Sequence, residues 1–163
     1  MAMVSSQPPD SIYVNVDAGR DLWLQGDLLA KTGRSLYGGG SDVVLSASRR
    51  LTLDKKLQVT ANDGGSTEFA IGPACAVAIN GTVRANTSPG VTSVVSYRDS
   101  LTFGPRAKLQ TTKGSNQIRC ACSDPNHDGL CDGGCLSEPI GLAGARIRPT
   151  AEIVPTALGP CGP

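Results

Sequence analysis

The sequence predicts an all-β chain: a short parallel β-helix (β-solenoid) of about four coils, followed by a disulfide-rich loop and an extended tail. Three observations predict this fold. Four segments between Val14 and Leu109 repeat one another loosely, 24 to 29 residues apart. Within each segment apolar residues alternate with polar ones, which is the periodicity of a strand. Five of the six cysteines lie after residue 119, in a stretch rich in turn residues.

The repeat aligns without a gap in four segments, Val16–Ala30, Leu45–Val59, Ile71–Ala85 and Val95–Leu109. Apolar residues then share five columns, which are Val16, Leu45, Ile71 and Val95; Leu22, Leu51, Val77 and Leu101; Leu24, Leu53, Ile79 and Phe103; Leu28, Leu57, Val83 and Ala107; and Ala30, Val59, Ala85 and Leu109. In a hairpin meander or a sandwich, alternate repeats would run in opposite directions. Identical columns in one chain direction fit parallel stacking better, so each repeat is expected to form one coil. We expect the inward ladders to be packing core rather than a ligand groove.

Each repeat is interrupted at the same place by residues that suit a corner. The pairs are Gln25-Gly26, Asp54-Lys55, Asn80-Gly81 and Gly104-Pro105. Glycine and asparagine tolerate positive φ and proline fixes φ, so these pairs are expected to end one strand and start the next. No segment has an apolar stripe with a 3.6-residue period, which argues against helix.

Two stretches carry a resemblance to a known family. They are Ala18-Gly-Arg-Asp-Leu-Trp-Leu-Gln-Gly-Asp-Leu-Leu-Ala30 and Ile79-Asn-Gly-Thr-Val-Arg-Ala85. Both resemble the repeats of filamentous-haemagglutinin-type and related secreted right-handed parallel β-helices, over about residues 12 to 114. The resemblance implies cell-surface adhesins, tail spikes or parts of fibrous appendages. It also leaves open the β-helical polysaccharide lyases and hydrolases.

Three regions are expected along the chain: a flexible lead-in over 1–11, the β-helix over 12–114, and a module with the cysteine-rich loop and a proline-rich tail over 115–163. The prolines of the tail exclude a helix. Two pieces of it, Ala145-Arg-Ile-Arg and Ala151-Glu-Ile-Val, are expected to be extended. They could lie along the last coil, or they could add a strand to a neighbouring molecule.

Dense, clustered cysteines in a loop-rich segment are typical of disulfides in an exported protein, so we expect an extracellular or cell-surface location. The four clustered residues Cys120, Cys122, Cys131 and Cys135 would most simply form two local bridges. A pair between Cys75 and Cys161 would attach the tail to the third coil. Connectivity does not follow from spacing alone.

The cysteine-rich loop contains the pattern Asp-x-Asn-x-Asp-Gly-x-x-Asp. Alternate oxygen ligands, a glycine at the sixth position and a carbonyl at the seventh are how an EF-hand-type loop wraps calcium. The expected ligands for Ca²⁺ are Asp124, Asn126, Asp128, Asp132 and the carbonyl of Leu130. The loop resembles the calcium loops of thrombospondin type 3 and dockerin-like repeats. The twelfth position departs from that pattern, because it is Cys135 where a bidentate glutamate is usual, so affinity should be lower unless an acid such as Glu138 completes the shell.

Two alternatives to calcium remain open from the residues. The loop could be a polar turn tied by cysteines that binds nothing, or the four clustered thiolates could hold tetrahedral zinc. Their Cys-x-Cys and Cys-x-x-x-Cys spacings are not the usual Cys-x-x-Cys knuckles. His127, the single histidine of the chain, is expected to be exposed and makes no catalytic arrangement alone.

The composition of the chain argues against several classes of function. A net charge of +1 and 4% aromatic residues argue against nucleic acid as a partner, and no apolar run is long enough for membrane insertion. The acids scatter over the repeat, so we expect no enzyme. The main hypothesis is an extracellular structural subunit that self-assembles, by end-to-end stacking or strand addition, into a fibre or surface appendage. The alternative is an adhesin that binds cell-surface glycans or proteins through the loops near Gly38 and Asn86.

Overall fold

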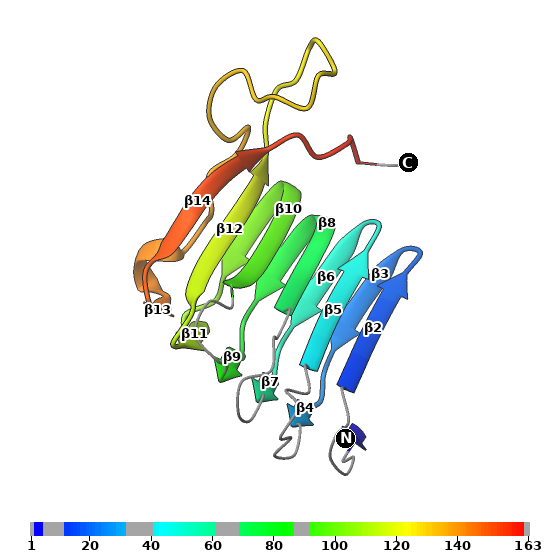
Figure 1. Cartoon of the computed structure of the whole chain (residues 1–163), viewed down its shortest axis with the longest axis vertical. Helices are drawn as coiled ribbons and strands as arrows, with labels where there is room; N and C mark the ends of the chain where they lie inside the picture. The colour runs from blue at the N-terminus through cyan, green and yellow to red at the C-terminus, as the bar shows by residue number, and fades with distance from the viewer. Residues whose placement is uncertain (1, 5–11, 32–40, 61–68, 87–91, 162–163) are drawn as a thin grey trace, which may run out of the picture.

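In the computed structural model the chain winds into a parallel β-solenoid, described for residues 2–4, 12–31, 41–60, 69–86 and 92–161 (Figure 1). Its strands are β1 (Ala2–Val4), β2 (Ile12–Ala18), β3 (Asp21–Leu24), β4 (Leu28–Lys31), β5 (Ser41–Ala47), β6 (Arg50–Leu53), β7 (Lys56–Thr60), β8 (Phe69–Ile79), β9 (Thr82–Asn86), β10 (Thr92–Phe103), β11 (Lys108–Thr112), β12 (Ser115–Ala121), β13 (Arg146–Arg148) and β14 (Ala151–Thr156). A short 3-10 helix, η1 (Leu142–Gly144), is the only helical element within these ranges. The expected all-β fold is confirmed.

The strands form two sheets, and every pairing between described strands is parallel. One sheet has the order β1-β4-β7-β9-β11-β13, and the other has the order β14-β12-β10-β8-β5-β2. The second sheet also includes β3 and β6, because β8 is long enough to pair with β5 and then with β6. Figure 1 shows β2 and β3 at one end of the stack and β14 at the other.

The repeat that the sequence displays is the repeat of the stack. Leu22 pairs with Leu51, Leu51 with Val77, and Val77 with Leu101, so three full turns separate the first of these residues from the last. The columns that begin at Val16 and Leu24 are in register in the same way. Like side chains therefore lie over like side chains, as parallel winding requires.

The last two predicted columns are wrong in the fourth repeat. Val83 pairs with Leu109 rather than with Ala107, and Ala85 pairs with Thr111 rather than with Leu109. The cause is the corner after Phe103, which is two residues longer than the corner after Ile79. The alignment could not detect the insertion, because Ala107 and Leu109 are both buried and both apolar.

Close stacking sets the residue choice at the corners. A Cβ on Gly81 would lie 2.0 Å from the carbonyl oxygen of Lys55 in the winding before it. No side chain fits there, so glycine is required where the third winding turns. The backbone hydrogen bonds continue through this corner, because Thr82 donates to the Lys55 carbonyl and Lys108 donates to the Gly81 carbonyl.

The core is a narrow aliphatic column, fully buried in its middle and less so at the first winding. Leu51, Leu53 and Leu57 have no exposed surface, whereas their first-winding counterparts Leu22, Leu24 and Leu28 are only partly buried. Each middle winding is covered above and below by its neighbours. In the described ranges, nothing pairs with the outer edge of β2 or β3.

A polar cluster lies at the other end of this core. The Asn116 side-chain oxygen accepts hydrogen bonds from Ser93 (2.5 Å) and Thr111 (2.6 Å), and its nitrogen donates to the Pro149 carbonyl (2.6 Å). The three side chains are buried, and their mutual bonds offset the cost of removing them from water.

The stack extends beyond the expected limits of the solenoid. Residues 115–121 form β12 on top of β10, although the sequence predicts that the β-helix ends at residue 114. The two extended pieces of the tail are β13 and β14, and both lie along the last winding, on β11 and β12. At the other terminus, residues 2–4 of the expected lead-in form β1 against β4.

Candidate functional site: the cysteine-rich loop and the two ends of the solenoid

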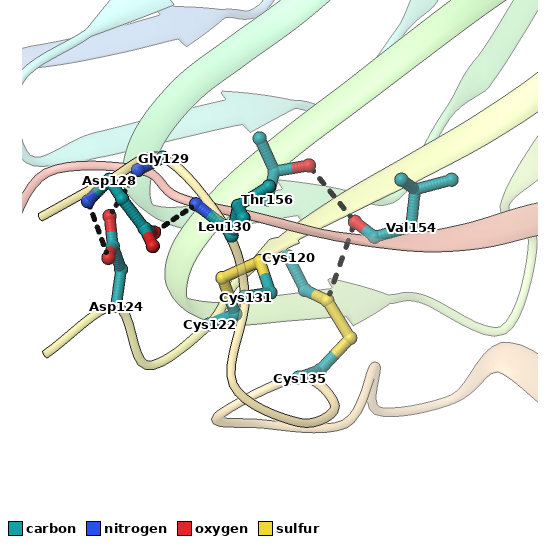
Figure 2. The surroundings of a disulfide bond; sticks show 10 residues. All are labelled: Cys120, Cys122, Asp124, Asp128, Gly129, Leu130, Cys131, Cys135, Val154 and Thr156. Atoms are coloured by element: carbon teal, nitrogen blue, oxygen red, sulfur yellow. Dashed lines mark hydrogen bonds between the residues drawn. A yellow bond between two sulfur atoms is a disulfide. The ribbon is translucent and has the colours of Figure 1, made fainter. Parts of the chain in front are cut away.

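Two disulfides close the loop that leaves β12. Cys120 is bonded to Cys135 and Cys122 to Cys131, the two local bridges that the clustering suggested (Figure 2). All six cysteines are paired. Zinc bound by four thiolates is therefore wrong for this oxidised chain, because each sulfur is part of an S–S bond.

The loop returns to the stack through hydrogen bonds from the fourth winding. The buried Tyr97 hydroxyl donates to the Ser137 carbonyl (2.6 Å), and the Ser137 hydroxyl donates to the Asp99 carbonyl (2.6 Å). Ile140 then pairs with β10, donating to the Leu101 carbonyl and accepting from the Phe103 amide. The returning chain thus covers this part of the fourth winding. Burial, followed by the charge of Glu138, raises the pKa of Tyr97 above its ordinary value.

The acidic side chains of the loop bind its own backbone. Figure 2 shows the Asp124 carboxylate facing the amides of Asp128 (3.2 Å) and Gly129 (3.0 Å), while Asp128 accepts from the Leu130 amide (2.9 Å). Such Asx-type bonds stabilise a tight turn without any ion. His127 is exposed, as expected, and has a positive φ of 56°.

The three carboxylates among the expected calcium ligands do not lie within 4.8 Å of one another. Among the described residues, three metal-binding groups lie within 4.8 Å of one another only at Cys75, Asp99 and Cys161, and those cysteines are bonded to each other. Asp124, Asp128 and Asp132 form no such group, although all three are described. A calcium ion needs six to eight oxygens at once, so the loop as it is folded does not fit one without rearrangement.

The third disulfide joins Cys75 in β8 to Cys161, across 86 residues. After β14 the chain turns back over the ends of the strands, and Figure 1 shows this segment in red along the top of the stack. Three disulfides indicate an oxidising environment. None of the described helices is long and apolar enough to cross a bilayer.

Within the described ranges, β2 and β3 form an unpaired edge at the N-terminal end of the second sheet. The Ala18 carbonyl accepts from Ser48 and the Leu24 carbonyl from Asp54, so these residues face the second winding. Alternate residues of a strand turn their backbone groups to opposite neighbours, which places Tyr13, Asn15 and Asp17 of β2 on the open side. None of these three is proline, so each offers a donor and an acceptor.

At the C-terminal end the edge strand is β14, and it offers fewer backbone hydrogen-bonding groups. The Thr156 carbonyl accepts a hydrogen bond from the Cys122 amide, so the backbone groups of Thr156 point toward β12. Those of the preceding residue, Pro155, therefore point away from the stack. Proline has no N–H, so one ladder bond is missing on the open side of β14. Ile153 lies on this edge and is 38% exposed, the same as its N-terminal counterpart Val16 at 37%.

Comparisons with protein-family models, with curated proteins and with solved structures found no match. The fold and the two edges therefore carry the functional argument.

The sequence reasoning missed one group of residues, the cations that line a corner of the stack. Lys56, Thr82, Lys108 and Arg146 occupy one ladder, with Lys55 and Arg106 beside it. The sequence signal that could have found this group is the recurrence of Lys56 and Lys108 at equivalent positions two windings apart. The two-residue insertion after Phe103 placed Lys108 in the wrong column and hid it.

Proposed function

We propose that the chain is an extracellular structural subunit that assembles end to end into a fibre or surface appendage. The supporting observation is a single column of inward side chains that no described strand covers at either end. Val16, Leu45, Ile71, Val95, Ile118 and Ile153 form this column through consecutive parallel pairings. Its four middle members are buried, and its two terminal members are each more than a third exposed.

Head-to-tail contact closes this column. If β2 of one copy pairs with β14 of the next, Val16 lies over Ile153 and the ladder continues in the same direction. Such a contact is heterologous, because two different surfaces meet, and heterologous contacts that do not close into a ring build filaments. Unpaired edge strands are the usual route for strand addition.

The three disulfides support an extracellular location, because such bonds persist where glutathione does not reduce them. The resemblance to filamentous-haemagglutinin-type repeats is part of the same proposal. The adhesin alternative relied on the loops near Gly38 and Asn86, and residues 32–40 and 87–91 lie outside the described ranges.

The test places a charge at each end in turn. Val16→Lys blocks the N-terminal end and Ile153→Lys blocks the C-terminal end, while Val94→Lys adds the same charge on the outer face of the middle strand β10. We expect filaments from the wild type and from the Val94 variant by negative-stain imaging and sedimentation. Each end variant alone should remain a monomer.

Mixing the two end variants separates the modes of contact. Head-to-tail contact predicts a one-to-one dimer that grows no further, since each partner supplies one intact end. A dimer formed by Ile153→Lys alone would instead indicate that two N-terminal ends meet. A wild type that sediments as a monomer at every concentration would contradict the proposal.

Calcium binding by the cysteine-rich loop is a separate proposal. The carboxylates would have to leave their backbone amides and move together, so we expect weak binding at most. Titration calorimetry of the wild type against Asp124→Asn tests it, and equal heats from the two proteins would contradict it.

A further inference from the structure

We infer that a groove along one corner of the solenoid binds an anionic polysaccharide. The groove has a volume of about 520 Å³ and is lined by five cations: Lys55, Lys56, Arg106, Lys108 and Arg146. Asp54 is the one acid among its lining residues. A chain whose net charge is +1 thus concentrates positive charge in a single concave strip.

The cations are held in place by the ladder itself. Lys56 pairs through Thr82 with Lys108, and Lys108 pairs with Arg146, so their side chains leave the same face of β7, β11 and β13. Strands are spaced about 4.8 Å apart, so the row spans about 14 Å. The backbone of this corner is continuously hydrogen-bonded, because Lys108 donates to the Gly81 carbonyl and Arg146 to the Ala107 carbonyl.

The lining of the groove carries an excess of positive charge within the described part of the chain, because five cations face one acid, Asp54. None of the five cations forms an ion pair there, whereas Arg49 on the neighbouring corner pairs with Asp21 at 2.7 Å. The Asp54 carboxylate is already engaged, because one oxygen accepts from Asn80 (2.8 Å) and the other from Trp23 (2.5 Å). These bonds lower the pKa of Asp54, and its charge also acts on Lys55 beside it, so the lining keeps a net charge of +4 (five cations less one carboxylate).

The dimensions favour a polymer with repeated anionic groups. A single small anion would contact only two or three of the five cations that line the groove. Arginine forks bind carboxylate and sulfate groups in two-bond geometry, and lysines add point charges. No aromatic side chain lines the groove, so it lacks the stacking platform that single-stranded nucleic acid uses. The oxidising environment that the disulfides indicate also favours a polysaccharide.

The experiment measures binding of the whole chain to immobilised polygalacturonate (carboxylated), heparin (sulfated), dextran (neutral) and single-stranded DNA. We expect binding to at least one charged polysaccharide, none to dextran, and affinity that falls as salt rises. The charged polysaccharide that binds more tightly shows whether the groove prefers carboxylate or sulfate groups. Stronger retention on DNA than on both charged polysaccharides, or equal retention on dextran, would overturn the inference.

Paired variants locate the site. Lys56→Gln with Lys108→Gln removes two of the three charges of the row, and we expect affinity to fall about tenfold. Lys31→Gln with Lys113→Gln removes the same charge outside the groove and should change affinity less than about twofold. Both pairs are repeated in the Val16→Lys background, so that multivalent binding by an assembled fibre does not contribute. Equal losses from the two pairs would show that net charge, rather than the groove, holds the polymer.

Discussion

The two ends of the solenoid continue the same ladders but are completed by different interactions. At the N-terminal end the first winding is joined to the second by side-chain contacts at the surface, such as the Asp21–Arg49 ion pair and the hydrogen bond from Trp23 to Asp54. At the C-terminal end two disulfides close the loop after β12, a third joins the tail to β8, a polar cluster is buried, and Pro155 blunts the edge. The stack therefore has a polarity that its repeated core does not have.

The largest expected effect tests the C-terminal bridges. Replacing Cys75 and Cys161 by alanine removes a constraint across 86 residues, which we expect to lower the free energy of unfolding by about 4–5 kcal/mol. Replacing Cys122 and Cys131, nine residues apart, should cost about 2.5 kcal/mol, because a shorter loop loses less entropy on closing. Urea unfolding followed by circular dichroism measures both values. Equal losses would mean that the long bridge adds no more than the short one.

The second prediction compares one column at two depths. Leu51→Ala should lower the free energy of unfolding by about 3–5 kcal/mol, because its side chain is fully buried. Leu22→Ala, one strand nearer the open end, should cost about 1–2 kcal/mol, since part of its surface already meets solvent. The same urea experiment applies. Similar losses at the two positions would show that the first winding is covered in solution, as it would be inside a fibre.

The third prediction concerns the polar cluster. Asn116→Ala leaves the Ser93 and Thr111 hydroxyls and the Pro149 carbonyl short of a partner, and we expect a loss of about 1–3 kcal/mol. Hydrogen exchange should show the loss of protection in β12 and β14 and not in β2 to β4. Gln117→Ala, whose side chain points outward, is the matched control and should change stability by less than about 0.5 kcal/mol.

The smallest effect is a pH dependence of opposite sign at the two ends. The pKa of Asp21 is lowered, first by its hydrogen bond from Arg49, and that of Asp54 is lowered by Asn80 and then Trp23. The contribution of these two carboxylates to the free energy of unfolding is present above the ordinary carboxyl pKa and is lost as pH falls through the folded-state value. Acid below about pH 4 should therefore destabilise the first windings.

Burial raises the pKa of Tyr97. The contribution of this side chain to the free energy of unfolding is therefore present below about pH 10 and is lost as pH rises through the higher folded-state value. Alkali should therefore loosen the return of the cysteine-rich loop. Hydrogen exchange at the two extremes of pH measures this. Asp54→Asn should remove the part of the acid dependence that comes from Asp54, and Tyr97→Phe should remove the alkaline dependence. Loss of protection at the same end in both conditions would contradict the assignment.

The aliphatic columns could be predicted because parallel stacking repeats the same side chain in one chain direction. Val83 and Leu109 show the limit of that argument, since one apolar residue replaces another when a corner lengthens. Asn116 was not predicted to be buried, because a polar residue among alternating positions is usually solvated, and its partners come from two other strands and the tail. The acids of the calcium-like loop match a pattern of residue types, but backbone amides compete for the same oxygens and decide where Asp124 points.

The bridge between Cys75 and Cys161 also decides how the molecule would carry tension. A pull applied between Ile12 and Cys161 passes from the tail directly into β8 through the sulfur atoms. Residues 76–160 then lie off the path of the force. The force acts on the first two windings and their surface contacts. The N-terminal half would therefore unfold while the cysteine-rich half stayed folded.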